Sequence, residues 1–168
     1  LVAMVHNGII ENYRELAGEL KDDGCEFASE TDTEIVVHLI TKYVREGDSP
    51  QNAVARTLKR LVGAFSLGII FSGEEDLMIG ARLGSPLAVG YGDGEMYLGS
   101  DAMALAPMTN RISYLDEGDY VVLTRTGATF FDKDDNQVER EIKQTALSGA
   151  MIGKGNHRHF MMKEIFEQ

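Results

Sequence analysis

The sequence has one cysteine and no long apolar run among its 168 residues. A single thiol, Cys25, cannot form an internal disulfide, so the sequence lacks the cysteine framework of proteins from oxidising compartments. Its apolar segments are short and broken by charges, and none approaches the roughly 20 residues that a membrane-spanning helix needs. Because a signal peptide is also missing, we predict a cytoplasmic protein that does not associate with membranes.

Positive charge is scarce as well. Lys and Arg number 16 against 27 Asp and Glu, which gives a formal net charge of −11 and a pI of about 4.7. Such a surface repels phosphate backbones, so we predict no nucleic-acid partner. Among the four histidines, His157 and His159 alternate as metal ligands can, but no cysteine cluster or second ligand pair accompanies them. We expect neither a metal nor a cofactor.

The chain does contain regular apolar patterns, and 43% of its residues are hydrophobic, enough for one domain with a core. Helical spacing predicts three helices, over residues 12–23, from the capping residues 29–32 through Tyr43, and over 49–62. Ser100-Asp101 also predicts the start of a single helical turn that runs through Leu105. After Gly63 the pattern changes to short strand-like runs spaced as in an antiparallel meander, at 64–71, 77–81, 87–91, 96–98, 112–115, 120–123 and 128–131. Helices followed by antiparallel strands predict an α+β fold.

At the start of the chain, residues 1–5 predict a buried strand, and His6-Asn7-Gly8 follows it. Asn-Gly is a strongly preferred turn dipeptide, so a turn that ends the strand is one interpretation. The other is an oxyanion hole, because an Asn amide and a following Gly N–H can converge on one developing negative charge. The dipeptide by itself favours the turn.

Asp32 has two interpretations in the same way. Its carboxylate could cap the helix that follows, or it could hold a substrate ammonium group at the start of that helix. Taken in isolation, the residue favours the cap. A further segment, Gly90–Gly94, lies between two strand-like runs with no helix after it, which predicts a hairpin turn and not a phosphate site.

Several motifs follow one another along the chain: 5–13 (VHNGIIENY), 29–34 (SETDTE), 63–65 (GAF), 81–87 (ARLGSPL), 100–101 (SD), 115–119 (LDEGD) and 154–168 (KGNHRHFMMKEIFEQ). In this order they resemble the glutaminase domain of the glutamine–fructose-6-phosphate aminotransferases, or glucosamine-6-phosphate synthases. Asparagine synthetases and the amidotransferase of purine synthesis share the early motifs, but they are not expected to combine Ser85-Pro86-Leu87 with the tail residues Lys163-Glu164-Ile165. The tail resembles the connector into that family's sugar isomerase domain.

The resemblance implies an N-terminal-nucleophile hydrolase fold, a sandwich of two antiparallel sheets between helical layers. It also implies that an N-terminal cysteine attacks the side-chain amide of glutamine. Asn7 and Gly8 would form the oxyanion hole, and Asp32 would bind the glutamine ammonium group, with His6 also among the substrate-binding residues. Ammonia would pass to the isomerase domain and aminate fructose 6-phosphate.

The chain departs from the family at both ends. The family's nucleophilic cysteine and a carboxylate-binding arginine loop precede the first motif, and Leu1 is not an initiator methionine. We therefore expect residues 1–152 to be a truncated amidotransferase domain, incomplete at its N-terminus, and residues 153–168 a connector towards an absent isomerase domain. We expect this chain alone to be inactive. Because sheet edges and apolar surface would be exposed, we also expect it either to self-associate as a homo-oligomer or to be only marginally stable. The alternative is a catalytically dead domain that binds an amino acid or a protein partner.

Overall fold

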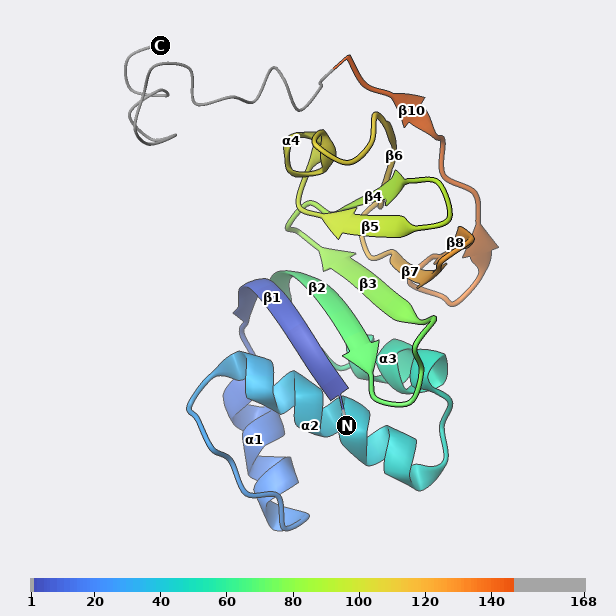
Figure 1. Cartoon of the computed structure of the whole chain (residues 1–168). Helices are drawn as coiled ribbons and strands as arrows, with labels where there is room; N and C mark the ends of the chain where they lie inside the picture. Colours follow the sequence, from blue (N-terminus) through green and yellow to red (C-terminus); the bar gives the residue numbers. More distant parts are fainter. Residues whose placement is uncertain (1, 147–168) are drawn as a thin grey trace, which may run out of the picture.

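The structure, a computed structural model, describes residues 2–146 (Figure 1). The predicted connector over residues 153–168 lies outside this part. The helices are α1 (Tyr13–Asp22), α2 (Asp32–Glu46), α3 (Pro50–Leu58) and α4 (Ala102–Leu105). The strands are β1 (Val2–Ile10), β2 (Gly63–Phe71), β3 (Met78–Leu83), β4 (Ala88–Tyr91), β5 (Met96–Gly99), β6 (Arg111–Tyr114), β7 (Tyr120–Thr124), β8 (Gly127–Phe131), β9 (Gln137–Val138) and β10 (Lys143–Gln144).

The strands form two antiparallel sheets. The larger has the order β1-β2-β3-β7-β8-β9, and the smaller has the order β10-β6-β4-β5. The predicted simple meander is therefore wrong, since the chain leaves the larger sheet after β3 and returns to it at β7 (Figure 1). The spacing of strands along the chain does not determine which sheet each strand joins, because that depends on packing between distant segments.

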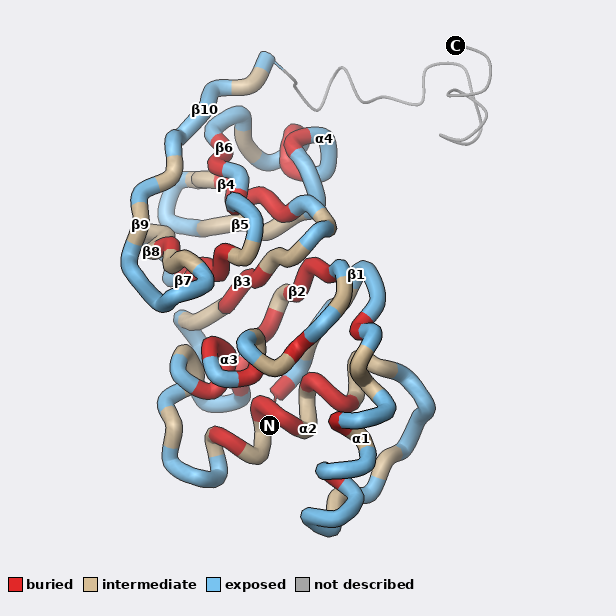
Figure 2. Tube along the Cα trace, turned by 180° about the vertical axis from the view of Figure 1, so that it is seen from behind, coloured by how far each residue is buried: buried red, intermediate tan, exposed pale blue. Residues whose placement is uncertain are grey.

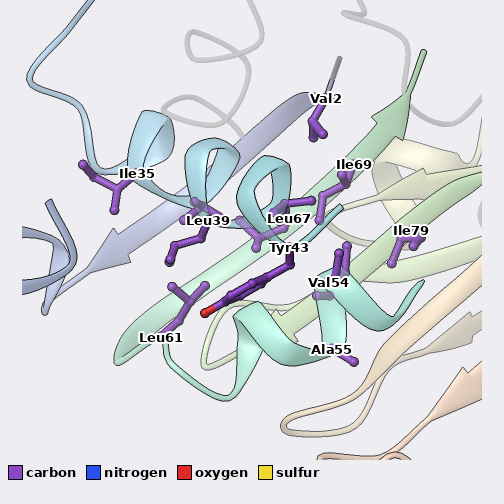
Figure 3. Packing of buried hydrophobic residues seen from close by; sticks show 14 of the residues in the cluster. Val2, Ile35, Leu39, Tyr43, Val54, Ala55, Leu61, Leu67, Ile69 and Ile79 are labelled. Atoms are coloured by element: carbon purple, nitrogen blue, oxygen red, sulfur yellow. The ribbon is translucent and has the colours of Figure 1, made fainter. Parts of the chain in front are cut away.

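Helices α1, α2 and α3 cover one face of β1, β2 and β3. Figure 3 shows Leu39 and Tyr43 of α2 and Val54 of α3 directed onto Leu67 and Ile69 of β2. All five side chains are buried. Burial of each large aliphatic or aromatic side chain contributes about 1.5–3 kcal/mol, so this helix–sheet layer is a major source of stability.

A second apolar cluster lies between the two sheets, where Val89 of β4 packs with Val121 and Leu123 of β7. A third joins Ala102 and Leu105 of α4 to the other face of the smaller sheet. The layers are thus helices, sheet, sheet and helix, as Figure 2 shows from behind with the buried residues between them. This arrangement confirms the predicted α+β sandwich of two antiparallel sheets between helical layers.

Local capping signals fix the starts of two helices, α3 and α4. Ser49 caps α3 by accepting a hydrogen bond from the Asn52 N–H at 3.3 Å, with Pro50 in the first turn. Asp101 caps α4 in the same way and accepts from the Ala104 N–H at 2.9 Å. In residues 2–146, no helix has the length and apolar character required to cross a membrane.

Strand β1 does not end at His6-Asn7-Gly8, so the turn interpretation of this motif is wrong. The strand continues to Ile10 and pairs with β2 without a break. Gly8 has φ +116°, and a Cβ atom there would lie 2.1 Å from the carbonyl oxygen of Ala64. Continuous pairing with β2 overrides the local turn preference, and the close approach of the two strands requires glycine at this position.

Candidate active site at the edge of β1

β1 is an edge strand: among the described residues it pairs with β2 alone (Figure 1). The Glu11 N–H donates to the Val62 carbonyl at 2.7 Å, whereas the Ile10 N–H donates away from β2, to Asp32. Amides alternate in direction along an antiparallel strand. The Gly8 N–H, two residues before Ile10, therefore points away from β2 and towards the open edge.

Asn7 lies next to this amide, with its side chain on the face of β1 opposite α2. Side chains alternate along a strand. His6 contacts α2, whereas Asn7 is exposed like Val5 and Ile9 on either side of it. The Asn7 side chain makes no hydrogen bond to any residue in the described part of the chain. Two hydrogen-bond donors, the Asn7 amide and the Gly8 N–H, thus remain available at the edge of the sheet.

Asp32 is the first residue of α2, and its carboxylate does not cap that helix. The N-cap residue is Thr31, and it makes no side-chain cap hydrogen bond. Instead, the Asp32 Oδ2 atom accepts a hydrogen bond from the Ile10 N–H at 2.8 Å. The cap interpretation is therefore wrong: the carboxylate joins the start of α2 to the same strand edge that carries Gly8.

His6 lies beside this carboxylate on the helix-facing side of β1. Its Nδ1 atom is 2.9 Å from the Thr33 Oγ1 atom, within hydrogen-bond distance, and 3.7 Å from the Asp32 Oδ1 atom. The His6 side chain is 4% exposed and that of Asp32 is 23% exposed. The fold therefore brings His6, Gly8 and Asp32 to one edge, although 24 residues separate the last two in sequence.

Glu34 fixes the connector that leads into α2, a role that the sequence interpretation missed. Its carboxylate accepts hydrogen bonds from the Ser29 hydroxyl at 2.6 Å and from the Ala28 and Ser29 N–H groups, both at 2.7 Å. The Ser29 hydroxyl, followed by the Ala28 N–H, lowers the pKa of Glu34 to about 2. The spacing of Thr31 and Glu34 is the signal that could have indicated this role, since it matches a capping box.

Cys25, the only cysteine of the chain, follows α1 in the same connector. Its N–H donates to the Leu20 carbonyl at 2.9 Å, and its side chain packs against the helix–sheet core. A hollow of 420 Å³ between α1 and this connector is lined by Tyr13, Phe27 and Ile35, among others, and by none of the predicted site residues. The candidate site is therefore an open strand edge and not this hollow.

Other motifs have structural roles. Asn12 donates to the Arg60 carbonyl at 2.8 Å and accepts from the Val62 N–H at 3.0 Å, which joins the end of β1 to the start of β2. In the segment 115–119, Asp119 is buried and receives two hydrogen bonds from Arg140, at 2.7 and 2.9 Å. These residues hold the fold together through bonds within the protein and are not among the groups left open at the β1 edge.

Comparison with known proteins agrees with this geometry. The sequence pattern of a family described as "Glutamine amidotransferase domain" matches residues 1–107, which include β1 and Asp32. The chain belongs to this family. The first element in the matched range is β1, whose open edge is described above.

Individual relatives resemble this amidotransferase over nearly its whole length. A glutamine–fructose-6-phosphate aminotransferase (isomerizing) of Bradyrhizobium diazoefficiens is 61% identical over 167 residues, and one of Zymomonas mobilis is 60% identical. The match covers 99% of this chain and 28% of each relative. The chain therefore spans little more than a quarter of the length of the curated relatives it matches.

Solved structures place the fold in the same group. Glutamine phosphoribosylpyrophosphate amidotransferase from B. subtilis, complexed with ADP and GMP, superposes with a TM-score of 0.66 at 26% sequence identity. It covers 81% of this chain, which in turn covers 30% of that protein. The likeness confirms the N-terminal-nucleophile hydrolase type of sandwich predicted from the sequence.

Proposed function

We propose that this chain is part of the glutaminase domain of a glutamine–fructose-6-phosphate aminotransferase. The observation that carries the proposal is the open edge of β1. The Asn7 amide and the Gly8 N–H are neighbours there in sequence, and the bond from the Ile10 N–H brings the Asp32 carboxylate to the same edge. Identity of 61% to a protein named for this activity, across 99% of the chain, supports it independently.

In the proposed reaction, water and the side-chain amide of glutamine give glutamate and ammonia. A nucleophile adds to the amide carbon, and the carbonyl electron pair moves onto oxygen. The Gly8 N–H, whose direction the pairing of β1 with β2 fixes, and the adjacent Asn7 side-chain amide then stabilise this oxyanion as charge develops. The leaving nitrogen takes up the proton of the nucleophile, so ammonia departs when the C–N bond breaks. Water then hydrolyses the acyl intermediate to glutamate, and one proton of the water returns to the nucleophile.

Asp32 would select glutamine by binding its α-ammonium group. The Ile10 N–H occupies one carboxylate oxygen, Oδ2, and so fixes the orientation of the group. The side chain is 23% exposed, which leaves it accessible to a small cation. A charge-assisted hydrogen bond here would distinguish glutamine from simple amides.

The remaining parts of the proposal concern partners and location. Ammonia from this site would aminate fructose 6-phosphate in an isomerase domain of the same protein, and the protein would act in the cytoplasm. We also propose self-association, which the exposed apolar side chains of Val5 (73%), Ile9 (64%) and Ile70 (52%) on β1 and β2 support. Light scattering that finds only monomers of this chain would contradict self-association.

Two substitutions in the complete natural protein test the roles of the site residues. Asn7→Ala should lower kcat on the order of a hundredfold, since it removes an oxyanion donor. Asp32→Ala should mainly raise the KM for glutamine, because it removes the ammonium partner. Steady-state ammonia release measures both. An unchanged KM for Asp32→Ala, or an unchanged kcat for Asn7→Ala, would remove that residue from the proposed site.

Cys25 provides a separate test on the 168-residue chain itself. Because its side chain packs into the helix–sheet core, we do not expect it to act as the nucleophile. Ammonia release from glutamine by this chain should therefore be weak or absent, and Cys25→Ser should leave it unchanged. Substantial turnover that disappears in Cys25→Ser would overturn this part of the proposal.

A further inference from the structure

His6 is a buried imidazole with only one of its two nitrogens in use. The side chain is 4% exposed, and Nδ1 lies within hydrogen-bond distance of Thr33. The other nitrogen, Nε2, is buried and has no hydrogen-bond partner among residues 2–146. Burial of an unsatisfied polar atom lowers stability, and an apolar residue of similar size would avoid this loss. Packing alone therefore does not explain a histidine at this position.

The surroundings of Nδ1 indicate what the histidine does. It is 2.9 Å from Thr33 Oγ1 and 3.7 Å from Asp32 Oδ1. The second Asp32 oxygen, Oδ2, is held by the Ile10 N–H at 2.8 Å. The carboxylate is thus bounded by the backbone of β1 at one oxygen and by the His6–Thr33 pair at the other. These contacts restrict both the position and the rotation of the carboxylate.

We infer that His6 is a positioning residue for Asp32, acting together with Thr33 and without contact to the substrate. The inference rests on the proposed function, in which Asp32 binds the α-ammonium group of glutamine. With His6 in place, the Asp32 carboxylate keeps one orientation towards the open edge of β1. Without the imidazole, only the Ile10 N–H holds the carboxylate, at Oδ2, so Oδ1 loses its polar neighbour and recognition of the ammonium group weakens.

This role predicts a change in specificity that a loss of stability alone does not produce. The useful pair of substrates is glutamine and 4-carbamoylbutanoate, which has the same amide and carboxylate but no α-amino group. His6→Leu should reduce the preference for glutamine over 4-carbamoylbutanoate by about tenfold. This is the scale of one hydrogen bond between charged groups, here the bond from the glutamine ammonium group to a carboxylate that is no longer well oriented. The kcat for glutamine should change by less than about threefold, since the oxyanion donors remain.

Conservative variants test the chemistry of the contact. His6→Asn can place an amide near the position of Nδ1, so it should restore most of the preference that His6→Leu removes. Thr33→Val removes the hydroxyl at nearly constant volume and should reduce the preference in the same direction, whereas Thr33→Ser should not. Thr57→Val is the matched control, because Thr57 is also buried and its hydroxyl donates to the Ala53 carbonyl, away from β1.

The substrate preference is measured as the ratio of kcat/KM values in the complete natural protein, with thermal unfolding recorded for every variant. An unchanged ratio in folded His6→Leu, beside a collapsed ratio in Asp32→Asn, would overturn the role of His6 and leave the proposed function standing. An unchanged ratio in Asp32→Asn would overturn both. If His6→Leu does not fold, Thr33→Val decides: a ratio equal to that of Thr57→Val overturns the inference.

Discussion

The edge strand β1 leaves polar groups open, whereas the turn between β6 and β7 uses its polar groups inside the fold. At β1, the Asn7 side chain has no partner in the described part of the chain, and the Gly8 N–H points away from β2. In the turn, Asp119 is 2% exposed and accepts two hydrogen bonds from Arg140 and one from the Asp116 N–H. Polar residues in a recognisable motif can therefore serve binding in one place and stability in another.

The contrast predicts that substitutions separate into two classes. Changes in the β6–β7 turn should lower stability and leave the edge chemistry intact in the molecules that fold. Changes to exposed side chains of β1, such as Asn7, should leave stability nearly unchanged and alter the reaction. The following predictions test this separation.

The largest effect on stability is expected for Asp119→Ala. It leaves the Arg140 guanidinium, whose side chain is only 20% exposed, without its buried partner. Breaking such a pair lowers the free energy of unfolding by about 3–5 kcal/mol. Urea unfolding measures the change. Glu141→Ala is the control, since its ion pair with Lys143 is exposed and 3.8 Å long, and it should cost less than about 1 kcal/mol. Equal effects of the two substitutions would contradict a structural role for the turn.

A smaller but still large effect is expected for Gly8→Ala. The new Cβ atom would lie 2.1 Å from the Ala64 carbonyl oxygen at a φ of +116°. Strain and the shift of β1 away from β2 should lower the free energy of unfolding on the order of 3 kcal/mol. Gly8 would then be required both for the stability of the fold and for the proposed oxyanion hole, unlike the exposed side chains beside it.

Gly18→Ala is the matched control for Gly8→Ala. Gly18 lies inside α1, and a Cβ atom there would meet nothing within 4 Å. Alanine is the better helix former, so this substitution should raise stability by about 1 kcal/mol. If both glycine substitutions change the urea midpoint in the same direction, the close approach of β1 and β2 is not the reason for Gly8.

The smallest expected effect is a local response of the connector to acid. The pKa of Glu34 is lowered from 4.5 to about 2, so its hydrogen bonds stabilise the folded connector fully above about pH 4.5. That contribution is lost as the pH falls from 4.5 towards 2, because protonation removes the acceptor charge. Amide exchange at Ala28 and Ser29, corrected for intrinsic rates, should become less protected over this interval.

Glu34→Gln provides the comparison for the acid response. The neutral side chain should give the less protected connector at every pH, with no change between pH 4.5 and 2. A wild-type protection that does not depend on pH over this interval would show that Glu34 does not hold the connector. The effect should be confined to residues near α2 and should not reach the Asp119–Arg140 pair.

Much of the local structure could be predicted from the sequence. The helix over 12–23 became α1, the capping residues Ser49 and Asp101 begin helices where expected, and the Gly90–Gly94 segment connects β4 to β5 in a hairpin. Each of these depends on contacts between residues close in sequence. Propensity, capping and turn chemistry act at that range, which is why the patterns succeed.

The two local interpretations that failed both concerned the candidate site. Asn7-Gly8 was favoured as a turn, and Asp32 was favoured as a helix cap, because each has that preference in isolation. In the structure, pairing of β1 with β2 extends the strand through Gly8, and the Ile10 N–H binds the Asp32 carboxylate. Functional residues commonly break local rules, since the fold uses them for purposes other than local structure.

The sequence by itself determined the helices, most of the strands and the family to which the chain belongs, because these depend on local periodicity and on ordered motifs. Only the tertiary structure decided that His6, Gly8 and Asp32 meet at one open edge. It also decided that the Asp119 carboxylate is buried and accepts hydrogen bonds from Arg140. The physical reason is distance along the chain. The partners that give these side chains their roles lie 21 to 27 residues away, beyond the reach of any local preference.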